Sequence, residues 1–125
     1  MASPIRSLGQ VGIRVKDMER ATRFYRDVLG LPFIWGSDGL SFFQCGSLRL
    51  LLDIPEQPEF DHPSSVLYFD VADIDRAAAD LESRGVTFRD RPHHIGDLGS
   101  VSVWMAFFED GEGNVLALQS ERPKH

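Results

Sequence analysis

Cysteine is almost absent from this chain. Cys45 is its only cysteine, so the sequence allows no intrachain disulfide and no zinc site built from several cysteines. The G-x-S-x-G motif, the Walker A loop, the dinucleotide-binding glycine motif and H-E-x-x-H are all missing. Serine hydrolase, nucleotide-dependent and zinc-protease chemistry therefore have no support. No histidine is near Cys45 in sequence, so we interpret this residue as an unreactive thiol.

Basic residues are in the minority. The 13 Lys and Arg residues are outnumbered by 19 Asp and Glu, which gives a net charge of −6. Without a basic stripe to meet phosphates, nucleic acid is an unsuitable partner. The sequence also has no hydrophobic run of membrane-spanning length and no apolar signal region after Met1. We therefore expect a cytoplasmic protein with neither a nucleic-acid nor a membrane partner.

An internal repeat is the main feature that the sequence does contain. Residues 11–33 are echoed by residues 67–88. Four residues recur with a constant offset of 56, namely Val15, Asp17, Arg20 and Ala21 as Val71, Asp73, Arg76 and Ala77. A repeat of this length predicts two copies of one supersecondary unit, with a binding cleft between them.

Hydrophobic periodicity predicts the order β-α-β-β-β in each copy. The expected strands are 10–15, 31–35, 40–45 and 48–53 in the first copy, and 66–71, 86–89, 100–109 and 114–120 in the second. Each helix begins after a capping aspartate, Asp17 or Asp73, and ends at a glycine, Gly30 or Gly85. Residues 90–99 are expected to form a loop. We predict an α+β fold in a single domain over residues 1–125, with unit one at about 7–53, a linker at 54–64 and unit two at about 65–120.

Two segments of the repeat carry a family resemblance, RVKDMERATRFYRDVLGLPF in the first copy and FFEDGEGNVLAL near the end. With the doubled unit, they resemble the vicinal oxygen chelate superfamily of glyoxalases, bleomycin-resistance proteins and dioxygenases, over roughly residues 7–120. The resemblance implies two tandem βαβββ units forming a U-shaped, mostly antiparallel sheet, with helices outside and a ligand in the trough. It also implies a homodimer. It does not specify an activity, because this fold carries several.

The same resemblance implies where a metal would be bound. Metal-using members place their ligands on the first and last strands of each unit, and the matching positions here are Gln10, Leu50, Val66 and Ala117. A divalent ion needs three or four donor atoms, and only Gln10 offers one. We therefore expect no metal and no other cofactor, and we assign Gln10 to substrate binding. A nonstandard metal site made by Gln10, His93 and Asp70 is the alternative.

Two side chains are candidates for acid/base catalysis. Tyr68 is predicted to face the trough from the middle of a strand, where its phenol could hydrogen-bond to a substrate oxygen or protonate it. A half-buried strand aromatic is the alternative interpretation. His93 follows Pro92 and is expected at the mouth of the trough. Its alternative is a solvated loop histidine.

Five further residues are predicted to bind substrate with Gln10. Arg14 suits a carboxylate, phosphate or enolate, and the alternative is an internal pair with Asp70, its counterpart in the repeat. Trp104, Phe43 and Leu50 are expected to line an apolar pocket, with core packing as the alternative.

These residues favour a small-molecule-binding protein, and we interpret it as an enzyme of the lyase or isomerase type. Its substrate would be a small carbonyl-bearing or aromatic compound, bound without metal chelation. The alternative is a non-catalytic protein that sequesters a drug or metabolite. A metal-dependent glyoxalase or extradiol dioxygenase would need ligands that the sequence does not contain.

Overall fold

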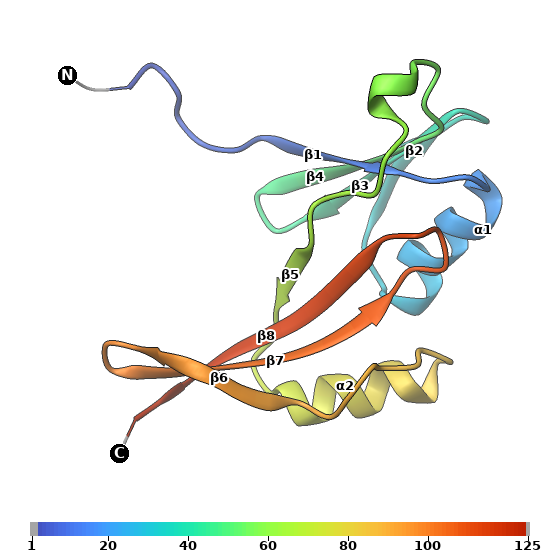
Figure 1. Ribbon diagram of the computed structural model, residues 1–125. Helices are drawn as coiled ribbons and strands as arrows, with labels where there is room; N and C mark the ends of the chain where they lie inside the picture. Colours follow the sequence, from blue (N-terminus) through green and yellow to red (C-terminus); the bar gives the residue numbers. More distant parts are fainter. Residues whose placement is uncertain (1–2, 125) are drawn as a thin grey trace. The chain divides into compact units, whose positions relative to one another are not determined.

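The computed structural model describes residues 3–124 and consists of two compact units, Met1–His62 and Pro63–His125. Each unit contains one four-stranded sheet with a helical segment against it (Figure 1). The division between the units falls inside the expected linker at 54–64. The predicted pair of βαβββ units is confirmed, since both units follow that order of elements.

The first unit has its strands in the order β1-β4-β3-β2. The pairing of β1 with β4 is parallel, and the other two pairings are antiparallel. Its elements are β1 (Gln10–Arg14), α1 (Met18–Arg23), the π-helical segment η1 (Phe24–Val28), β2 (Phe33–Gly36), β3 (Leu40–Cys45) and β4 (Leu48–Asp53). A short 3-10 helix, η2 (Pro58–Phe60), follows in the linker.

The second unit repeats this topology as β5-β8-β7-β6. Here β5 and β8 are parallel, and the remaining neighbours are antiparallel. Its elements are β5 (Leu67–Asp70), α2 (Ile74–Ser83), β6 (His93–Leu98), β7 (Val101–Glu109) and β8 (Val115–Pro123). The predicted mostly antiparallel character therefore holds for each sheet.

Capping aspartates begin both helices, as predicted. The Asp17 carboxylate accepts a hydrogen bond from the Arg20 backbone N at 3.0 Å, and Asp73 accepts one from the Arg76 N at 3.1 Å. The first helix then widens into η1, where the Leu29 N donates to the Phe24 O at 2.9 Å. Gly30 follows with φ of 75°, a conformation that glycine adopts without strain.

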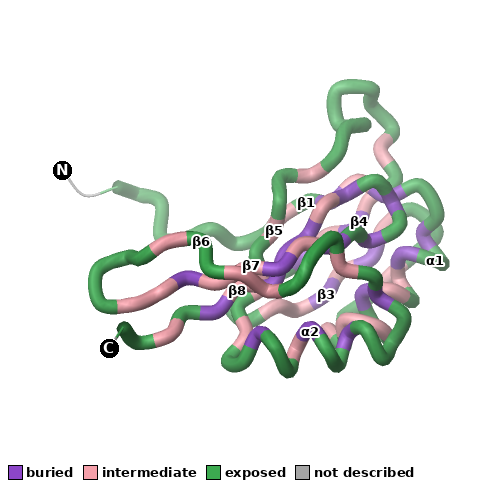
Figure 2. Tube along the Cα trace, turned by 60° about the horizontal axis from the view of Figure 1, so that its bottom comes forward, coloured by how far each residue is buried: buried purple, intermediate pink, exposed green. Residues whose placement is uncertain are grey.

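One face of each sheet packs against the helical segment of its unit, and we call it the helix face. Its residues form the core (Figure 2). In the first unit, the Ser41 Oγ lies 2.9 Å from the Thr22 Oγ1 of α1, and Phe43 packs against Tyr25 of η1 with ring centroids 6.1 Å apart. Fully buried side chains on the helix faces or the helices include Ile13, Tyr25, Phe43, Leu52, Ile74, Phe108 and Leu116.

The opposite face of each sheet points away from the α-helix of its unit, and we call it the open face. Alternation along a strand decides which face a residue occupies. Phe43 is 0% exposed and Leu50 is 2% exposed, so both lie on the helix face and not in a ligand pocket as predicted. Their neighbours Phe42 and Leu51 take the open face instead.

The second strand of the second unit also lies at a different position from the predicted one. Residues 86–89, predicted as a strand, form only an isolated bridge between Phe88 and Phe108. Residues 90–99, predicted as a loop, contain β6. The pairing with β7 shifts register between His94 and Gly96, which is typical of a bulge.

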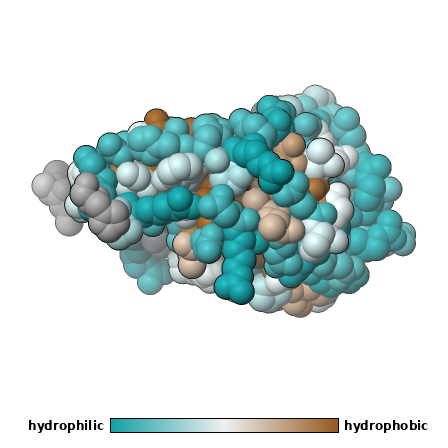
Figure 3. Space-filling view, turned by 90° about the horizontal axis from the view of Figure 1, so that it is seen from below, coloured by the Kyte–Doolittle hydropathy of each residue, from teal (hydrophilic) through white to brown (hydrophobic). Residues whose placement is uncertain are grey.

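The described part of the chain contains no helix with the length and hydropathy needed to cross a membrane. Hydrophilic residues predominate on the face of the molecule shown in Figure 3, and hydrophobic residues appear there in small, scattered groups. This surface agrees with the high proportion of charged residues, 26% of the chain.

Candidate functional site

The open face of the first sheet combines aromatic side chains with a cation. Gly12, Leu51, Phe42 and Trp35 form one row across its four strands, in the registers of the three strand pairs. The Trp35 and Phe42 rings have centroids 6.4 Å apart, and Trp35 is 56% exposed. This row is an apolar surface, and its most exposed member is Trp35 on the edge strand β2.

Arg49 lies in the next row of this open face, between Gln10 and Gln44. Its Nε donates to the Gln10 Oε1 at 3.3 Å, and its guanidinium carbon is 6.0 Å from the centroid of the Phe42 ring. The amide of Gln44 donates to the Gly46 O at 2.7 Å and the Leu48 O at 3.2 Å, across the β3–β4 turn. Gln10 therefore meets a cation here, beside an aromatic ring.

The open face of the second sheet is centred on Tyr68. Tyr68, Ala117 and Phe107 form one row, and the Tyr68 ring meets the Phe107 ring edge to face with centroids 6.0 Å apart. Tyr68 is 47% exposed. The prediction that Tyr68 points away from the helix therefore agrees with the structure. Its side chain is therefore accessible from the open face.

Asp70 and His93 share the adjacent row of this open face, at its two ends. The row runs Asp70, Gln119, Met105, His93. The Gln119 Nε2 donates to the Asp70 Oδ1 at 3.4 Å. Three strand spacings separate Asp70 from His93, which is about 14 Å along the sheet. A single ion does not bridge that distance, so these two residues do not support the nonstandard metal site.

His93 is held at the edge of the sheet by its own segment. Its Nδ1 lies 3.0 Å from the Arg91 O and 3.5 Å from the Asp90 Oδ2, and its side chain is 43% exposed. Tyr68 occupies the opposite edge strand, β5. The two predicted catalytic residues therefore lie on the same face of the sheet. Because they are on its opposite edge strands, they are too far apart to contact the same atom of a ligand bound on this face.

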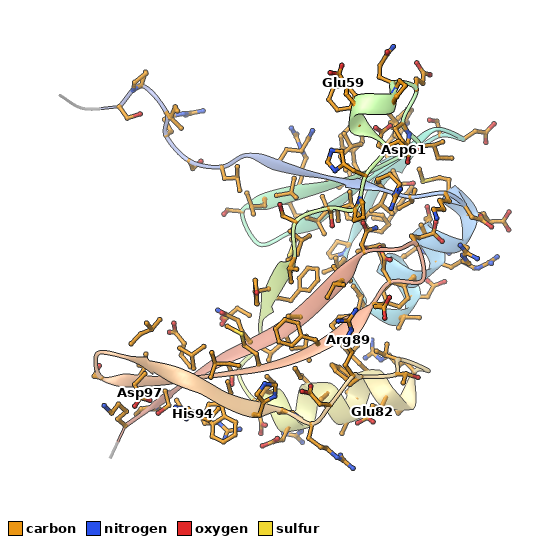
Figure 4. All side chains as sticks on the ribbon, viewed as in Figure 1. Glu59, Asp61, Glu82, Arg89, His94 and Asp97 are labelled. Carbon is orange, nitrogen blue, oxygen red and sulfur yellow. The ribbon has the colours of Figure 1, made fainter. Side chains whose placement is uncertain are left out.

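Arg14 is a largely enclosed charged residue of the first open face. Its side chain is 11% exposed, and its Nη1 donates to the Asp61 Oδ1 at 2.9 Å. Asp61 follows η2 in the linker (Figure 4). Arg14 thus has an acidic partner inside the first unit, which was not foreseen. The pairing of Arg14 with Asp70, which would join the two units, stays a prediction.

Trp104 lies on the helix face, not on the open face as predicted, because it alternates in step with the buried Ala106 and Phe108. Its ring has its centroid 5.6 Å from that of His94, and the Arg122 guanidinium carbon is 4.5 Å from its centroid. The Trp104 ring therefore packs against the His94 ring and the Arg122 guanidinium.

A polar network surrounds this tryptophan. The His94 Nε2 lies 2.9 Å from the Asp97 Oδ1, and the Ser102 Oγ donates to the same oxygen at 2.9 Å (Figure 4). The hydrogen bond from His94, with that from Ser102, lowers the pKa of Asp97 below its ordinary value.

Cys45, in the first unit, shows the opposite effect, since burial raises the pKa of its thiol. A raised pKa reduces the thiolate fraction and with it the reactivity.

The register corrects one of the four metal-ligand positions. Ala117 pairs with Tyr68 in the second sheet, and Leu51 pairs with Gly12, the repeat equivalent of Tyr68, in the first. The position on β4 is therefore Leu51 and not Leu50. Leucine, valine and alanine side chains have no donor atom, so the donor set Gln10, Leu51, Val66 and Ala117 does not fit a divalent ion. Within residues 3–124, no three His, Cys, Asp or Glu side chains cluster as metal ligands.

Arg49 is the open-face residue that the sequence interpretation missed. A signal for it exists in the β3–β4 hairpin, whose two-residue turn Gly46–Ser47 pairs Gln44 with Arg49. Two polar residues flanking a tight turn on one face indicate that this face is the exposed one. Every second residue of a strand lies on the same face, so Leu51 on β4 and Phe42 on β3 share the face of Arg49 and Gln44.

Comparison with known proteins gives a family and several structural relatives. Residues 7–118 match the family model described as the Glyoxalase/Bleomycin resistance protein/Dioxygenase superfamily. The uncharacterized protein YraH of Bacillus subtilis (strain 168) is 27% identical, over 87% of this chain and 94% of its own.

Two solved structures illustrate the range of proteins that share this fold. Lactoylglutathione lyase from Agrobacterium tumefaciens has a TM-score of 0.75 and 21% identity, covering 94% of this chain and 95% of its own. TnmS3, an antibiotic binding protein from Streptomyces sp. CB03234, has a TM-score of 0.77 and 24% identity, covering 98% of this chain and 100% of its own. At these identities the likeness concerns the fold.

Proposed function

The chain belongs to the glyoxalase/bleomycin resistance protein/dioxygenase superfamily. We propose that it binds a small aromatic, oxygen-bearing molecule on the open faces of its sheets. The observation that carries the proposal is the exposure of aromatic rings there. Trp35 is 56% exposed and Tyr68 is 47% exposed, and each packs against a second aromatic ring of its own sheet. Ligand sites of this kind are mostly apolar with a few polar groups.

Tyr68 is the polar group that we assign to the ligand oxygen in the second sheet. Its ring is fixed by the edge-to-face contact with Phe107, so its hydroxyl has a defined direction. Binding then needs neither a metal nor another cofactor, because a phenol and aromatic surfaces supply the contacts. The donor set at the ligand positions of the superfamily supports this, since only Gln10 could coordinate.

The test uses 2-acetonaphthone, a neutral aromatic ketone, as the probe in isothermal titration calorimetry. Tyr68→Phe removes one hydrogen bond of about 1 kcal/mol, so the affinity is expected to fall about fivefold. Trp35→Ala tests the open face of the first sheet separately and is expected to weaken binding there by a similar factor or more, through lost stacking area. Trp104→Phe, on the helix face, is the matched control and should leave the affinity unchanged. Absence of binding, or equal losses in all three variants, would refute the proposal.

An enzymatic role is the second candidate, and the position of Tyr68 favours it. A half-exposed phenol two residues from Asp70 on the same strand face could donate its proton to a ligand carbonyl oxygen. We propose this for the lyase or isomerase function, with Tyr68 as the acid. Mass spectrometry of the bound ligand separates the two roles. A sequestering protein returns its ligand unchanged, whereas an enzyme converts it, and Tyr68→Phe would stop the conversion while leaving the fold intact.

We also propose a cytoplasmic homodimer. Its support is the family membership together with exposed apolar residues on the edge strand β2, where Phe33 and Ile34 are 42% and 48% exposed. Light scattering coupled to size-exclusion chromatography tests the dimer, and cell fractionation tests the location. A monomer of 14.1 kDa at micromolar concentration would contradict the first of these.

A further inference from the structure

We infer that Arg49 makes the open face of the first sheet selective for aromatic ligands that carry a carboxylate. The inference rests on the proposed function and deepens it by naming the class of ligand. It assigns the charged end of the ligand to Arg49 and the aromatic part to the row formed by Gly12, Leu51, Phe42 and Trp35.

The first step is the state of the Arg49 guanidinium. Its Nε donates a hydrogen bond to the Gln10 Oε1 at 3.3 Å, and its guanidinium carbon lies 6.0 Å from the centroid of the Phe42 ring. Among the residues that the structure describes, no Asp or Glu carboxylate lies within 4.0 Å of it. The two terminal nitrogens form a fork that matches the two oxygens of a carboxylate.

The second step is a comparison with the other arginines of an acidic chain. Of the ten other arginines, six have a carboxylate pair inside their own unit: Arg14 with Asp61, Arg23 with Glu19, Arg26 with Asp27, Arg84 with Asp80, Arg89 with Glu109 and Arg122 with Asp75. Arg49 contacts an amide and a ring instead. A cation kept on an aromatic surface without an acidic neighbour, in a chain of net charge −6, is suited to an anion from outside the sheet.

The third step is room for a ring beside the cation. Leu51 lies in the row next to Arg49, between Gly12 on β1 and Phe42 on β3. A Cβ built on Gly12 would meet no atom within 4 Å, so the space above this end of the row is open. A planar aromatic group can therefore lie over Gly12 and Leu51 with its edge toward Phe42. Its carboxylate then reaches the Arg49 fork one row away, because same-face rows are about 6.7 Å apart along a strand and neighbouring strands are about 4.8 Å apart.

Gln10 acts in this arrangement as a positioning residue. Its side-chain oxygen holds the Arg49 Nε and so limits the rotation of a long, flexible side chain. A neutral amide does this without cancelling the charge, whereas a glutamate at the same position would form an internal ion pair. The difference between an amide and a carboxylate at position 10 therefore controls whether Arg49 remains available.

The experiment compares 2-naphthoate with 2-naphthamide, which share a ring system and differ in charge. Calorimetric titration at low salt measures both affinities for the native protein and its variants. We expect the native protein to prefer the carboxylate by about tenfold, and Arg49→Gln to abolish this preference. Gln10→Glu should also abolish the preference. Arg76→Gln, at an exposed arginine on α2, is the control and should retain it.

The outcomes separate this inference from the proposal beneath it. If both probes bind equally well to the native protein, or if Arg49→Gln keeps the preference, the role of Arg49 is overturned and aromatic binding stands. If neither probe nor 2-acetonaphthone binds, both are overturned. Circular dichroism of Arg49→Gln confirms that the variant is folded, and Gln10→Glu gives an independent readout because it leaves Arg49 in place.

Discussion

Arg14 on β1 and Asp61 in the linker form an ion pair in which the two partners differ in exposure. The Arg14 Nη1 lies 2.9 Å from the Asp61 Oδ1, while the side chains are 11% and 60% exposed. Enclosing a guanidinium is costly unless a partner compensates for the lost hydration. The pair therefore both stabilises Arg14 and attaches the linker to the first strand.

Asp61→Asn is expected to lower the free energy of unfolding by about 1 kcal/mol. A hydrogen bond to a charged group contributes about 1.5–3 kcal/mol, and the exposure of Asp61 reduces that value through solvent screening. Urea denaturation followed by circular dichroism measures the change. Glu59→Gln is the matched control, because Glu59 is an exposed carboxylate of the neighbouring η2 without an ion pair among the described residues. Equal effects of the two variants would contradict the role of the pair.

Phe42 and Phe43 are adjacent in sequence and lie on opposite faces of the first sheet. Phe43 packs against Tyr25 and Phe33 with no exposed surface, so Phe43→Ala should destabilise the protein by about 3–5 kcal/mol. Phe42 is half-buried on the open face, and Phe42→Ala should cost about 1 kcal/mol while weakening the binding of 2-naphthoate. Thermal denaturation and calorimetric titration of both variants check this assignment of faces. It fails if the two stability effects are alike.

This pair also illustrates where sequence interpretation succeeds and where it does not. The helix caps Asp17 and Asp73 were predicted correctly, because capping depends on residues three positions apart in the chain. The faces of β3 and β4 were assigned wrongly at Phe43 and Leu50, because consecutive hydrophobic residues give no alternation to count. The polar residues Gln44 and Arg49 on either side of the turn contained the missing information.

The strand β6 could not have been predicted from its own residues. His93–Leu98 contains histidine, glycine and aspartate, which have low strand propensity, and its side chains alternate poorly between buried and exposed. Its conformation comes from pairing with β7, a neighbour whose register is decided by the fold. The faces that His93 and Trp104 occupy depend on that register. It pairs His93 with Met105 and His94 with Trp104, so His93 and Trp104 lie on opposite faces of the sheet.

Asp97→Asn should destabilise the protein more at pH 6 than at pH 3. Hydrogen bonds from His94 and Ser102 lower the pKa of Asp97 in the folded state. A lowered folded pKa means that the stabilisation is present above the unfolded pKa and disappears as the pH falls through the folded pKa. Urea midpoints at the two pH values measure the difference. Asp38→Asn, in the exposed β2–β3 turn, is the comparison and should show no such convergence.

Asn114→Ala is expected to destabilise the protein by about 2–3 kcal/mol, since it removes hydrogen bonds from the buried Asp110 and the half-buried Ser64. The Asn114 side chain is fully buried, its Nδ2 donates to the Asp110 Oδ2 at 2.8 Å, and its Oδ1 accepts from the Ser64 N at 2.9 Å. The Asp110 Oδ1 also accepts from the Glu112 N at 2.7 Å, so this turn depends on side chains.

Denaturant unfolding gives the loss in stability for Asn114→Ala, and amide hydrogen exchange at Ser64 reports the broken bond directly. Ser100→Ala, in the exposed β6–β7 turn, provides the control and should change neither quantity. Unchanged protection of the Ser64 amide in Asn114→Ala would mean that another acceptor holds the start of the second unit. In that case the buried turn would stabilise only its own hairpin between β7 and β8.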